Sequence, residues 1–352
     1  MKIPIQNLYY LLCFAWNYAP QDLAMDVGAI PASSDVLELC SYVLATGMDY
    51  LFRRGLDQGY LLHEEQTARL RGRIHMTQTV RCRAWSRPQA VCQFDELSPN
   101  VLHNQIIRTT AESLMCVPSV NSGLRDRLRT VYVNLAGVSI VPVTDALFRR
   151  VQLHRNNSYY AFLMFVCRLV HSLKLPTPVA GEERFRDLLS DEKIMERVFE
   201  EFLRNFYRLK QQEFSRVDSA HLKWAVEPIG QSNLDLLPEM RTDVTLRSET
   251  RTIIMDAKYY KDALREHYGT KKAHSGNLYQ LLAYLRAEAA SLPHVKPEGI
   301  LIYPVGDSEV DQSYLIDGYR VRLYTLNLNQ TWQEIERDLL GLLSMDAARP
   351  TA

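Results

Sequence analysis

The segment RTDVTLRSETRTIIMDAKYYKD, residues 241–262, predicts a β-hairpin with strands at about 240–247 and 252–260. Side chains alternate between the two faces of a strand, so Asp256 and Lys258 share one face. If Glu249 and Thr250 form the loop, counting back places Asp243 directly opposite Asp256. Glu-Thr is a poor sequence for a tight hairpin turn, which leaves the register open by a residue or two. The hairpin therefore carries two acids and a lysine where strands are usually apolar.

Two facing carboxylates predict a cation between them. Directly paired side chains have Cβ atoms about 4.5–5.5 Å apart, and carboxylates that close repel unless they are protonated or bridged. Mg²⁺ suits such oxygen ligands where phosphate is also present, with the carbonyl of Ala257 as a candidate further ligand. Lys258 could then activate a water or stabilise a pentavalent phosphate. The alternative is a surface salt-bridge cluster, because D-x-K is short and common, but the apolar context IIMDAKYY favours the metal site.

Composition sets wide limits on what the chain does. Its 352 residues suit two domains, and 47% hydrophobic residues can form real cores. Lys plus Arg and Asp plus Glu both number 41, so nucleic-acid binding would need a local patch or a partner that supplies affinity. The six cysteines contain no CxxC pair, and a zinc site is not expected. The N-terminal segment lacks signal-peptide features and no run is long enough to span a bilayer, so we expect a soluble, cytoplasmic protein.

Apolar spacing predicts an α+β protein in two parts. The first half is mostly helical, with helices at 5–18, 35–54, 99–116, 121–134 and 157–174 and a β-rich insert at 58–95. The Pro-, Gly- and charge-rich LPTPVAGEERFRD indicates a linker over 176–190 between domains 1–175 and 191–352. The second half runs helix 191–212, strand 221–228, the hairpin, helix 275–290 with Ser275 as N-cap, strands 299–304 and 319–328, and a final helix from 331.

This order and its acids resemble the PD-(D/E)xK nuclease fold, which has an αβββαβ core. The matching residues are Thr242-Asp243, in place of Pro-Asp, followed a dozen residues later by Asp256-Ala257-Lys258. In the next helix Gln280 and Tyr284 are similar to the Q-x-x-x-Y motif of RecB-type nucleases. Residues four apart share one face of a helix. Taken alone this motif is weak, and it gains weight because it follows D-x-K.

Longer blocks resemble the McrC family, the nuclease subunits of McrBC methylcytosine-dependent restriction systems. They cover most of the chain and are IPIQNLYYLLCFAWNY, GRIHMTQTVRC, FDELSPNVLHNQIIR, LLPEMRTDVTLR, DAKYYK, HSGNLYQLLAYL and GILIYP. The resemblance implies a Mg²⁺-dependent endonuclease for double-stranded DNA whose N-terminal domain docks on a hexameric AAA+ GTPase, McrB, and stimulates its GTP hydrolysis. GTP would be bound by that partner, because this sequence has no GxxxxGK[ST] motif.

The resemblance also assigns site residues. The catalytic positions are Asp243, Asp256 and Lys258, supported by Gln280 and Tyr284. The metal ligands would be Asp243, Asp256, the Ala257 carbonyl and one acid of the preceding helix. That acid is Glu200, chosen from Glu196, Glu200 and Glu201; helix glutamates are more often solvated.

Two basic stretches remain open between function and ordinary surface. The first carries Arg69, Arg71, Arg73, Arg81 and Arg83, followed by Arg87, with no acid among them. It is either a surface for the partner or DNA, or a set of solvated strand edges protected from aggregation by charge. The second is a predicted polar loop at 268–277 whose Lys271, Lys272 and His274 could contact DNA phosphates. His274 is also a second choice as general base.

Two other functions stay possible on the sequence. One is a stand-alone RecB-like nuclease that needs no GTPase. The other is a nuclease-derived activator that stimulates a motor GTPase without cleaving DNA, which would leave Asp243, Asp256 and Lys258 without a reason to be present together.

Overall fold

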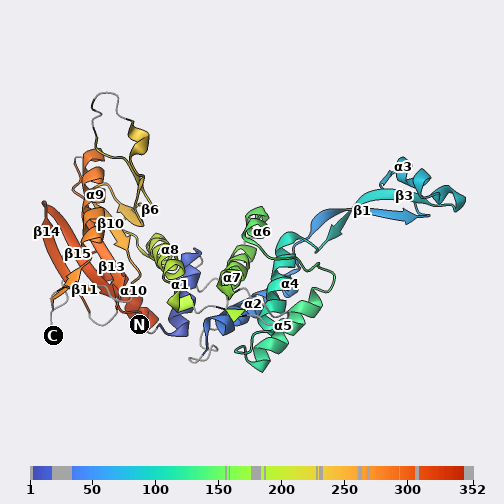
Figure 1. The fold of residues 1–352 in the computed structure, drawn as a ribbon, viewed down its shortest axis with the longest axis horizontal. Coiled ribbons are helices and arrows are strands. Elements are labelled where there is room, and N and C mark those ends of the chain that lie inside the picture. The colour runs from blue at the N-terminus through green and yellow to red at the C-terminus, as the bar shows by residue number, and fades with distance from the viewer. Residues whose placement is uncertain are drawn as a thin grey trace. The chain divides into compact units, whose positions relative to one another are not determined.

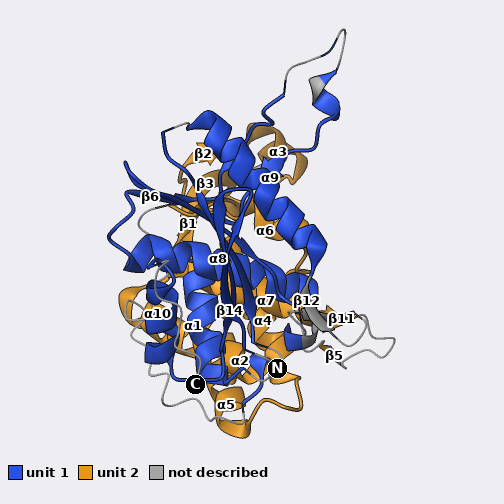
Figure 2. Cartoon of the chain, turned by 90° about the vertical axis from the view of Figure 1, so that its left-hand side faces the viewer, with its two compact units in different colours: residues 1–36, 186–352 blue, residues 37–185 orange. Residues whose placement is uncertain are grey.

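The chain folds into two compact units, shown in Figure 2. Unit 1 comprises residues 1–36 and 186–352, and unit 2 comprises residues 37–185. The computed structural model describes residues 3–17, 34–154, 157, 159–175, 184–185, 188–226, 229, 233–260, 264–267, 270–292, 294–305 and 309–344. Both helices and strands are present, which confirms the α+β class. Among these residues no helix is both long and apolar enough to cross a membrane.

A six-stranded mixed sheet forms the centre of unit 1, in the order β14-β15-β13-β10-β9-β6. The strands are β6 Arg216–Asp218, β9 Val244–Arg247, β10 Thr252–Ala257, β13 Glu298–Pro304, β14 Asp311–Ile316 and β15 Tyr319–Leu326. β6, β9 and β10 form an antiparallel meander, and β10, β13 and β15 run parallel. Every residue of β10 is buried, as expected for a central strand covered on both faces.

The hairpin has the register counted from the two-residue loop. Thr252 pairs with Arg247, and Met255 pairs with Val244. Ser248 N–H donates to the Arg251 carbonyl at 2.9 Å and closes the loop at residues 249 and 250. The same counting, extended one residue beyond the ladder, sets position 243 opposite position 256.

Helices cover this sheet on both sides. On one face α9, Ser275–Ser291, packs Leu281 and Leu285 against Ile254. Gly299 of β13 permits this close approach, since a Cβ there would lie 2.9 Å from both leucines. The other helices of the unit are α8 Glu192–Lys210, which contacts β9 and β10, α1 Ile5–Ala15 and α10 Trp332–Gly341.

The first helix packs with the C-terminal half of the chain. The Phe14 ring of α1 lies 5.4 Å from Phe206 of α8 and 5.4 Å from Trp332 of α10. Asn205 of α8 donates to the Ala15 carbonyl at 3.1 Å. The predicted domain 1–175 placed this helix with the first half. Periodicity locates a helix and its apolar face but does not say which partner covers that face.

Three other local predictions differ from the structure. Among the described residues 221–226 of the predicted strand 221–228, β7, His221–Leu222, is the only strand, and it pairs with β8, Met240–Arg241, in a separate small sheet. The first strand of the meander is β6 instead. The predicted loop 268–277 contains β12, Thr270–Ala273, paired with β11, Leu264–His267. The N-cap of α9 is His274, not Ser275, because the His274 side chain accepts from the Gly276 N–H.

Unit 2 combines a helical body with a small sheet that extends from it, drawn in cyan in Figure 1. The body contains α2 Val36–Arg54, α4 Leu102–Met115, α5 Ser122–Asn134, α6 Asp145–Arg150 and α7 Tyr159–Leu173. The sheet pairs β1 Gly59–Thr67 and β2 Arg73–Ile74 with β3 Ala90–Ser98, beside α3 Met76–Arg81. Two short strands, β4 Lys174–Leu175 and β5 Arg184–Phe185, follow α7. The helical half with a β-rich insert was predicted correctly.

A buried polar cluster fixes the base of that small sheet. Asp57, two residues before β1, accepts from Asn157 at 2.8 Å and lies 3.1 Å from Nε2 of His103 on α4. Its N–H donates to the Tyr160 hydroxyl at 3.1 Å, and its carbonyl accepts from Asn104 at 3.1 Å. Burial lowers the pKa of His103, against the opposing effect of Asp57 and with a contribution from His154. His103 therefore stays neutral in the folded unit near neutral pH.

We expect Phe14→Ala to lower the free energy of unfolding of unit 1 by about 3–5 kcal/mol, because it opens a cavity in the α1–α8–α10 core. Leu209→Ala on the exposed side of α8 is the control and should change it by less than about 1 kcal/mol. Urea unfolding of the full chain measures both. Equal effects from the two variants would show that α1 does not stabilise unit 1.

We expect the stability of unit 2 to fall as pH drops from 7.5 to 5.5. The folded-state pKa of His103 lies below its unfolded value near 6.5, so the unfolded chain binds the proton at a higher pH than the folded one. Lowering the pH therefore stabilises the unfolded state relative to the folded state. His103→Gln should flatten this pH slope, whereas His63→Gln on the exposed strand β1 should keep it. Urea unfolding at both pH values, with unit 2 followed by hydrogen exchange of α4 and α7, tests the difference.

Candidate active site

Asp256 and Lys258 lie at the end of β10, on the face covered by α9. Asp256 is fully buried, and its Oδ2 lies 3.0 Å from Nζ of Lys258. Apart from this ion pair, neither carboxylate oxygen has a hydrogen-bond partner within the described part of the chain. Lys258 N–H donates to the Ile302 carbonyl at 3.0 Å, so the strand geometry continues through the lysine. The pair is therefore fixed in position, and the Asp256 carboxylate could bind a further positive charge.

Asp243 reaches the same place from the break between β8 and β9. Its Oδ2 accepts from Ala257 N–H at 2.8 Å and lies 4.0 Å from Nζ of Lys258. In an antiparallel pair the N–H and C=O of one residue point to the same neighbouring strand. The Ala257 carbonyl thus faces the Asp243 side, and its role as a metal ligand stays a prediction. The structure brings all three motif residues together.

The charges at this site do not balance. Burial raises the pKa of Asp256 and of Asp243, and the Lys258 ammonium only partly offsets it. Burial also acts to lower the pKa of Lys258, but Asp256 and Asp243 outweigh that effect and raise it. Lys258 is therefore charged, and one ammonium faces two carboxyl groups, of which that of Asp256 is fully buried and that of Asp243 is 16% exposed. A further cation would relieve this deficit.

Helix α8 adds acids from the other side. Burial, with the nearby charges of Asp243 and Glu196, raises the pKa of Glu200 to about 7. Glu201 is instead paired with the buried Arg204 at 2.6 Å, which removes it from the candidates. The charge of Glu196 acts on Asp243, Asp256 and Lys258, and Glu200 responds to Asp243 and Lys258, so both glutamates stay candidates for the helix-borne acid.

Helix α9 supplies the predicted glutamine and tyrosine. Gln280 Nε2 donates to the Tyr284 hydroxyl at 2.7 Å. Burial raises the pKa of Tyr284, Gln280 lowers it, and Asp256 and Asp243 raise it, which places the phenol beside the acids. The sequence did not predict a second pair, in which Asn277 donates to the buried Tyr303 hydroxyl at 3.1 Å. The pKa of Tyr303 is raised by burial and also responds to Asp256.

Asn277 lies one turn before Gln280 on the same helix, so the helical spacing could have identified it as a candidate site residue from the sequence. Tyr303 is on β13, and it enters the site only because β13 pairs with β10 in parallel. That pairing is not visible in the local sequence.

The predicted basic residues lie in other parts of the structure or have side chains outside the described residues. The side chains of Lys271 and Lys272 lie outside the described residues, although their backbone forms β12. Nδ1 of His274 accepts from Gly276 N–H at 3.2 Å, so it caps α9. The arginines at 69, 71, 73, 81 and 83 are exposed on unit 2. Arg71 pairs with Glu65 at 2.6 Å and lies over the Phe94 ring at 3.7 Å.

The donor set was compared with what a metal ion requires. The described residues hold no group of three or more His, Cys, Asp or Glu side chains placed as a metal cluster. Mg²⁺ nevertheless needs only one or two carboxylates, with water and substrate phosphate completing its shell. Two buried carboxylates whose charge exceeds that of the single lysine fit such an ion. Asp256, Asp243 and the Ala257 carbonyl are the groups that would hold it.

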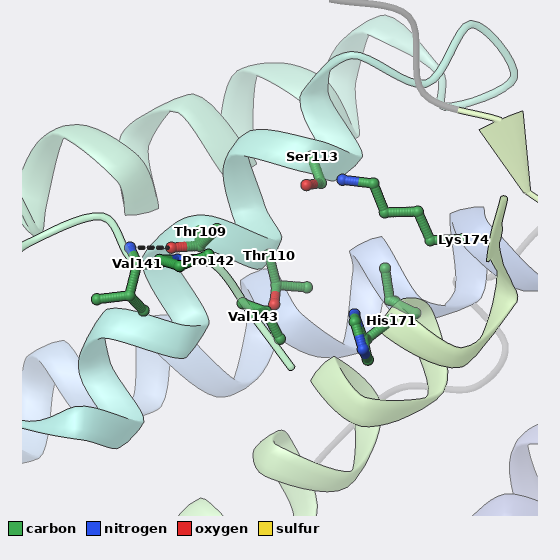
Figure 3. Close-up of a pocket in the computed structure, with 9 residues that line it drawn as sticks. Thr109, Thr110, Ser113, Val141, Pro142, Val143, His171 and Lys174 are labelled. Atoms are coloured by element: carbon green, nitrogen blue, oxygen red, sulfur yellow. Dashed lines mark hydrogen bonds between the residues drawn. The ribbon is translucent and has the colours of Figure 1, made fainter. Parts of the chain in front are cut away.

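The structure also contains a cavity of about 330 Å³ in unit 2, between α4, α7 and residues 141–143 (Figure 3). Hydroxyl groups of α4, His171 and Lys174 line it, and Thr109 accepts from Val141 N–H at 3.2 Å. No carboxylate lines this cavity, and none of the motif residues reaches it. The acidic site of unit 1 is therefore the stronger candidate for chemistry.

Comparison with known proteins identifies the family. A family model described as "McrBC 5-methylcytosine restriction system component" matches residues 6–304. The chain belongs to this McrBC family. It is also 36% identical over 346 residues, 97% of each chain, to a protein of Escherichia coli (strain K12) named "Type IV methyl-directed restriction enzyme EcoKMcrBC". The matched range of the McrBC model includes α8, the hairpin and α9, and thus every acid of the candidate site.

A solved structure shares the fold. It is described as a half-complex from the tetradecameric assembly of Thermococcus gammatolerans McrB AAA+ hexamers with bound McrC. The alignment has a TM-score of 0.61 at 16% identity and covers 97% of this chain and 76% of that chain. The likeness therefore extends over both units.

We expect Lys258→Met to lower the free energy of unfolding by about 3–5 kcal/mol, because it leaves two buried carboxylates without their cation. Adding Asp256→Asn should recover most of the loss, since the remaining acid then has no charged neighbour to repel. Urea unfolding of the two single variants and the double variant, in chelator-treated buffer, gives the coupling energy. Additive effects would mean that the 3.0 Å contact carries no interaction.

Proposed function

We propose that this chain is the DNA-cleaving subunit of an McrBC-type restriction complex. The observation that carries the proposal is the buried group of Asp243, Asp256 and Lys258, in which two carboxylates face a single ammonium. A buried acid without enough compensating charge is costly to stability. Such an arrangement is best explained by a cation and a reaction that use it.

The element order supports a PD-(D/E)xK nuclease fold for unit 1. Counting only the strands of the six-stranded sheet, α8 is followed by β6, β9 and β10, then by α9 and β13, which gives the αβββαβ order. The D-x-K acid lies on the central strand and the first acid enters from the neighbouring strand of the meander. Thr242 takes the place of the proline in the usual motif.

We infer that the cofactor is Mg²⁺, held by Asp243, Asp256 and the Ala257 carbonyl, with Glu200 as the helix-borne acid. Its charge would polarise the phosphate and favour ionisation of the attacking water. Lys258 is held between two carboxylates and presents its ammonium where negative charge grows on the phosphate in the transition state. Gln280 donates to the Tyr284 hydroxyl and would hold it in position on the α9 side of the site.

The partner in this proposal is an McrB-like AAA+ GTPase hexamer; the Thermococcus structure is described as containing McrB AAA+ hexamers with bound McrC. GTP would bind to that partner, because this sequence has no P-loop motif. Unit 2 offers the exposed arginines of the β1–β3 sheet, at positions 69, 71, 73, 81 and 83, for the partner or for DNA. Lys271, Lys272 and His274 are the candidates for contacts to DNA phosphates near the acids.

We expect Asp256→Asn to reduce cleavage of methylated plasmid by at least about 100-fold, since it removes a metal-binding charge. The assay contains Mg²⁺, GTP, this chain and its cognate McrB-like partner. Stimulation of the partner's GTPase should stay within about twofold, because unit 2 is unchanged. Glu249→Gln, in the exposed loop of the same hairpin, is the matched control and should cleave like the wild type.

The same assay separates the alternatives. Cleavage by this chain without the partner would indicate a stand-alone RecB-like nuclease. GTPase stimulation without any cleavage would indicate an activator and overturn the catalytic role of the hairpin. Cleavage that survives Asp256→Asn would also overturn it.

A further inference from the structure

The polypeptide changes sheets over two residues, and the second of them is the first catalytic acid. β8 ends at Arg241 in the small β7–β8 sheet, and β9 begins at Val244 in the six-stranded sheet. Only Thr242 and Asp243 make the connection. The position of the Asp243 carboxylate therefore depends on how firmly Thr242 is held.

Thr242 is held by both its backbone and its side chain, and it is 1% exposed. Its N–H donates to the Ala220 carbonyl at 3.0 Å, and its Oγ1 accepts from the Ala220 N–H at 2.9 Å. Its carbonyl accepts from the Ser219 hydroxyl at 2.6 Å. Oγ1 is also 2.7 Å from the hydroxyl oxygen of Thr245, which is fully buried on β9.

These contacts join three segments at one residue. Ala220 and Ser219 lie between β6 and β7, and Thr245 belongs to β9. The next side chain along the chain is the Asp243 carboxylate, fixed at its far end by the Ala257 N–H at 2.8 Å. An aspartate tied at both ends has little freedom to leave the site.

We propose that Thr242 is a positioning residue, which fixes the backbone between β8 and β9 and thereby holds Asp243 in place for metal binding. The identity of the reaction that this metal serves rests on the proposed function. We call this set of hydrogen bonds the clamp. In the related motif a proline at this place restricts the backbone through its ring and has no N–H to donate. Here hydrogen bonds from the backbone and the hydroxyl perform the restriction. The hydroxyl is the part of Thr242 that a substitution can remove without changing its shape.

The probe is Mn²⁺, titrated by calorimetry into the full chain. Thr242→Val removes the hydroxyl and leaves the Ala220 N–H without its acceptor, so Mn²⁺ binding should weaken about 10- to 100-fold, as for other groups that orient metal ligands. Thr242→Ser keeps the hydroxyl and should bind within about threefold of the wild type. Thr242→Pro should bind more weakly than Thr242→Ser, because it lacks the N–H used by Ala220.

Thr252→Val is the matched control. Thr252 is also 1% exposed, lies on β10 of the same sheet, and its hydroxyl has no hydrogen-bond partner among the residues that the structure describes. Losing that hydroxyl should leave Mn²⁺ affinity unchanged. If Thr242→Val does not fold, Ser219→Ala removes one bond of the clamp at a less buried position and should weaken Mn²⁺ binding by a smaller factor in the same direction.

Cleavage by the complete complex provides the second readout. Thr242→Val should need a higher Mg²⁺ concentration for half-maximal rate, and Thr242→Ser should restore the wild-type requirement. Wild-type Mn²⁺ affinity in folded Thr242→Val and Ser219→Ala overturns the proposal, as does a wild-type chain that binds no Mn²⁺. A wild-type chain that binds Mn²⁺ and loses it in Thr242→Val, yet cuts no DNA, supports the clamp and contradicts the proposed function instead.

Discussion

The burial of the Asp256 carboxylate is the constraint around which unit 1 is organised. Its strand is covered on both faces, so the acid has no water to solvate it and one ammonium at 3.0 Å to balance it. An ion pair in such surroundings gains less from attraction than it loses by leaving water, unless further groups complete it. The charges of Asp243 and of Glu196 on α8 also act on that carboxylate, and Asp256 in turn affects the pKa of Tyr284 and of Tyr303. Their arrangement is costly to stability and is best explained by the chemistry we propose.

Strand register controls whether these groups meet. A slip of one residue in the β9–β10 pairing would turn Asp243 to the opposite face, away from Asp256. The loop Glu249-Thr250 is not a favoured tight turn and cannot enforce the register by itself. The pairing of β10 with β13 on its other edge, and the anchoring of Thr242 on Ala220, hold it from outside the loop. The site depends in this way on tertiary contacts more than on the turn.

The same distinction explains what could be predicted from the sequence. The hairpin, its acids and the helices α8 and α9 follow from local periodicity and from short motifs, and both helices were placed close to their observed bounds. The first hairpin strand is shorter than the predicted 240–247, because residues 240–241 belong to β8 of another sheet and β9 begins at Val244. β6 was not predicted, because three residues carry too little pattern. The alternating residues 221–228 carry more pattern, but β7 within them belongs to the small β7–β8 sheet and not to the main sheet. Tyr303 and the packing of α1 depend on which elements become neighbours, and that information is not local. The resemblance to a nuclease family indicated the candidate catalytic residues, but only the structure shows that Glu201 forms an ion pair with Arg204.

The distribution of charge has a consequence for how such a chain would engage DNA. Its formal net charge is zero, and the candidate site itself gathers acids, so the site repels phosphate until a cation joins Lys258. A run of exposed arginines lies in unit 2, on a different unit from the acids. Affinity for a polyanion grows with the number of phosphates neutralised, and one lysine at the site contributes little to it. On the proposed function, binding strength must then come mainly from surfaces outside the catalytic residues, including those of a partner, while the buried acids determine only where the bond is cut.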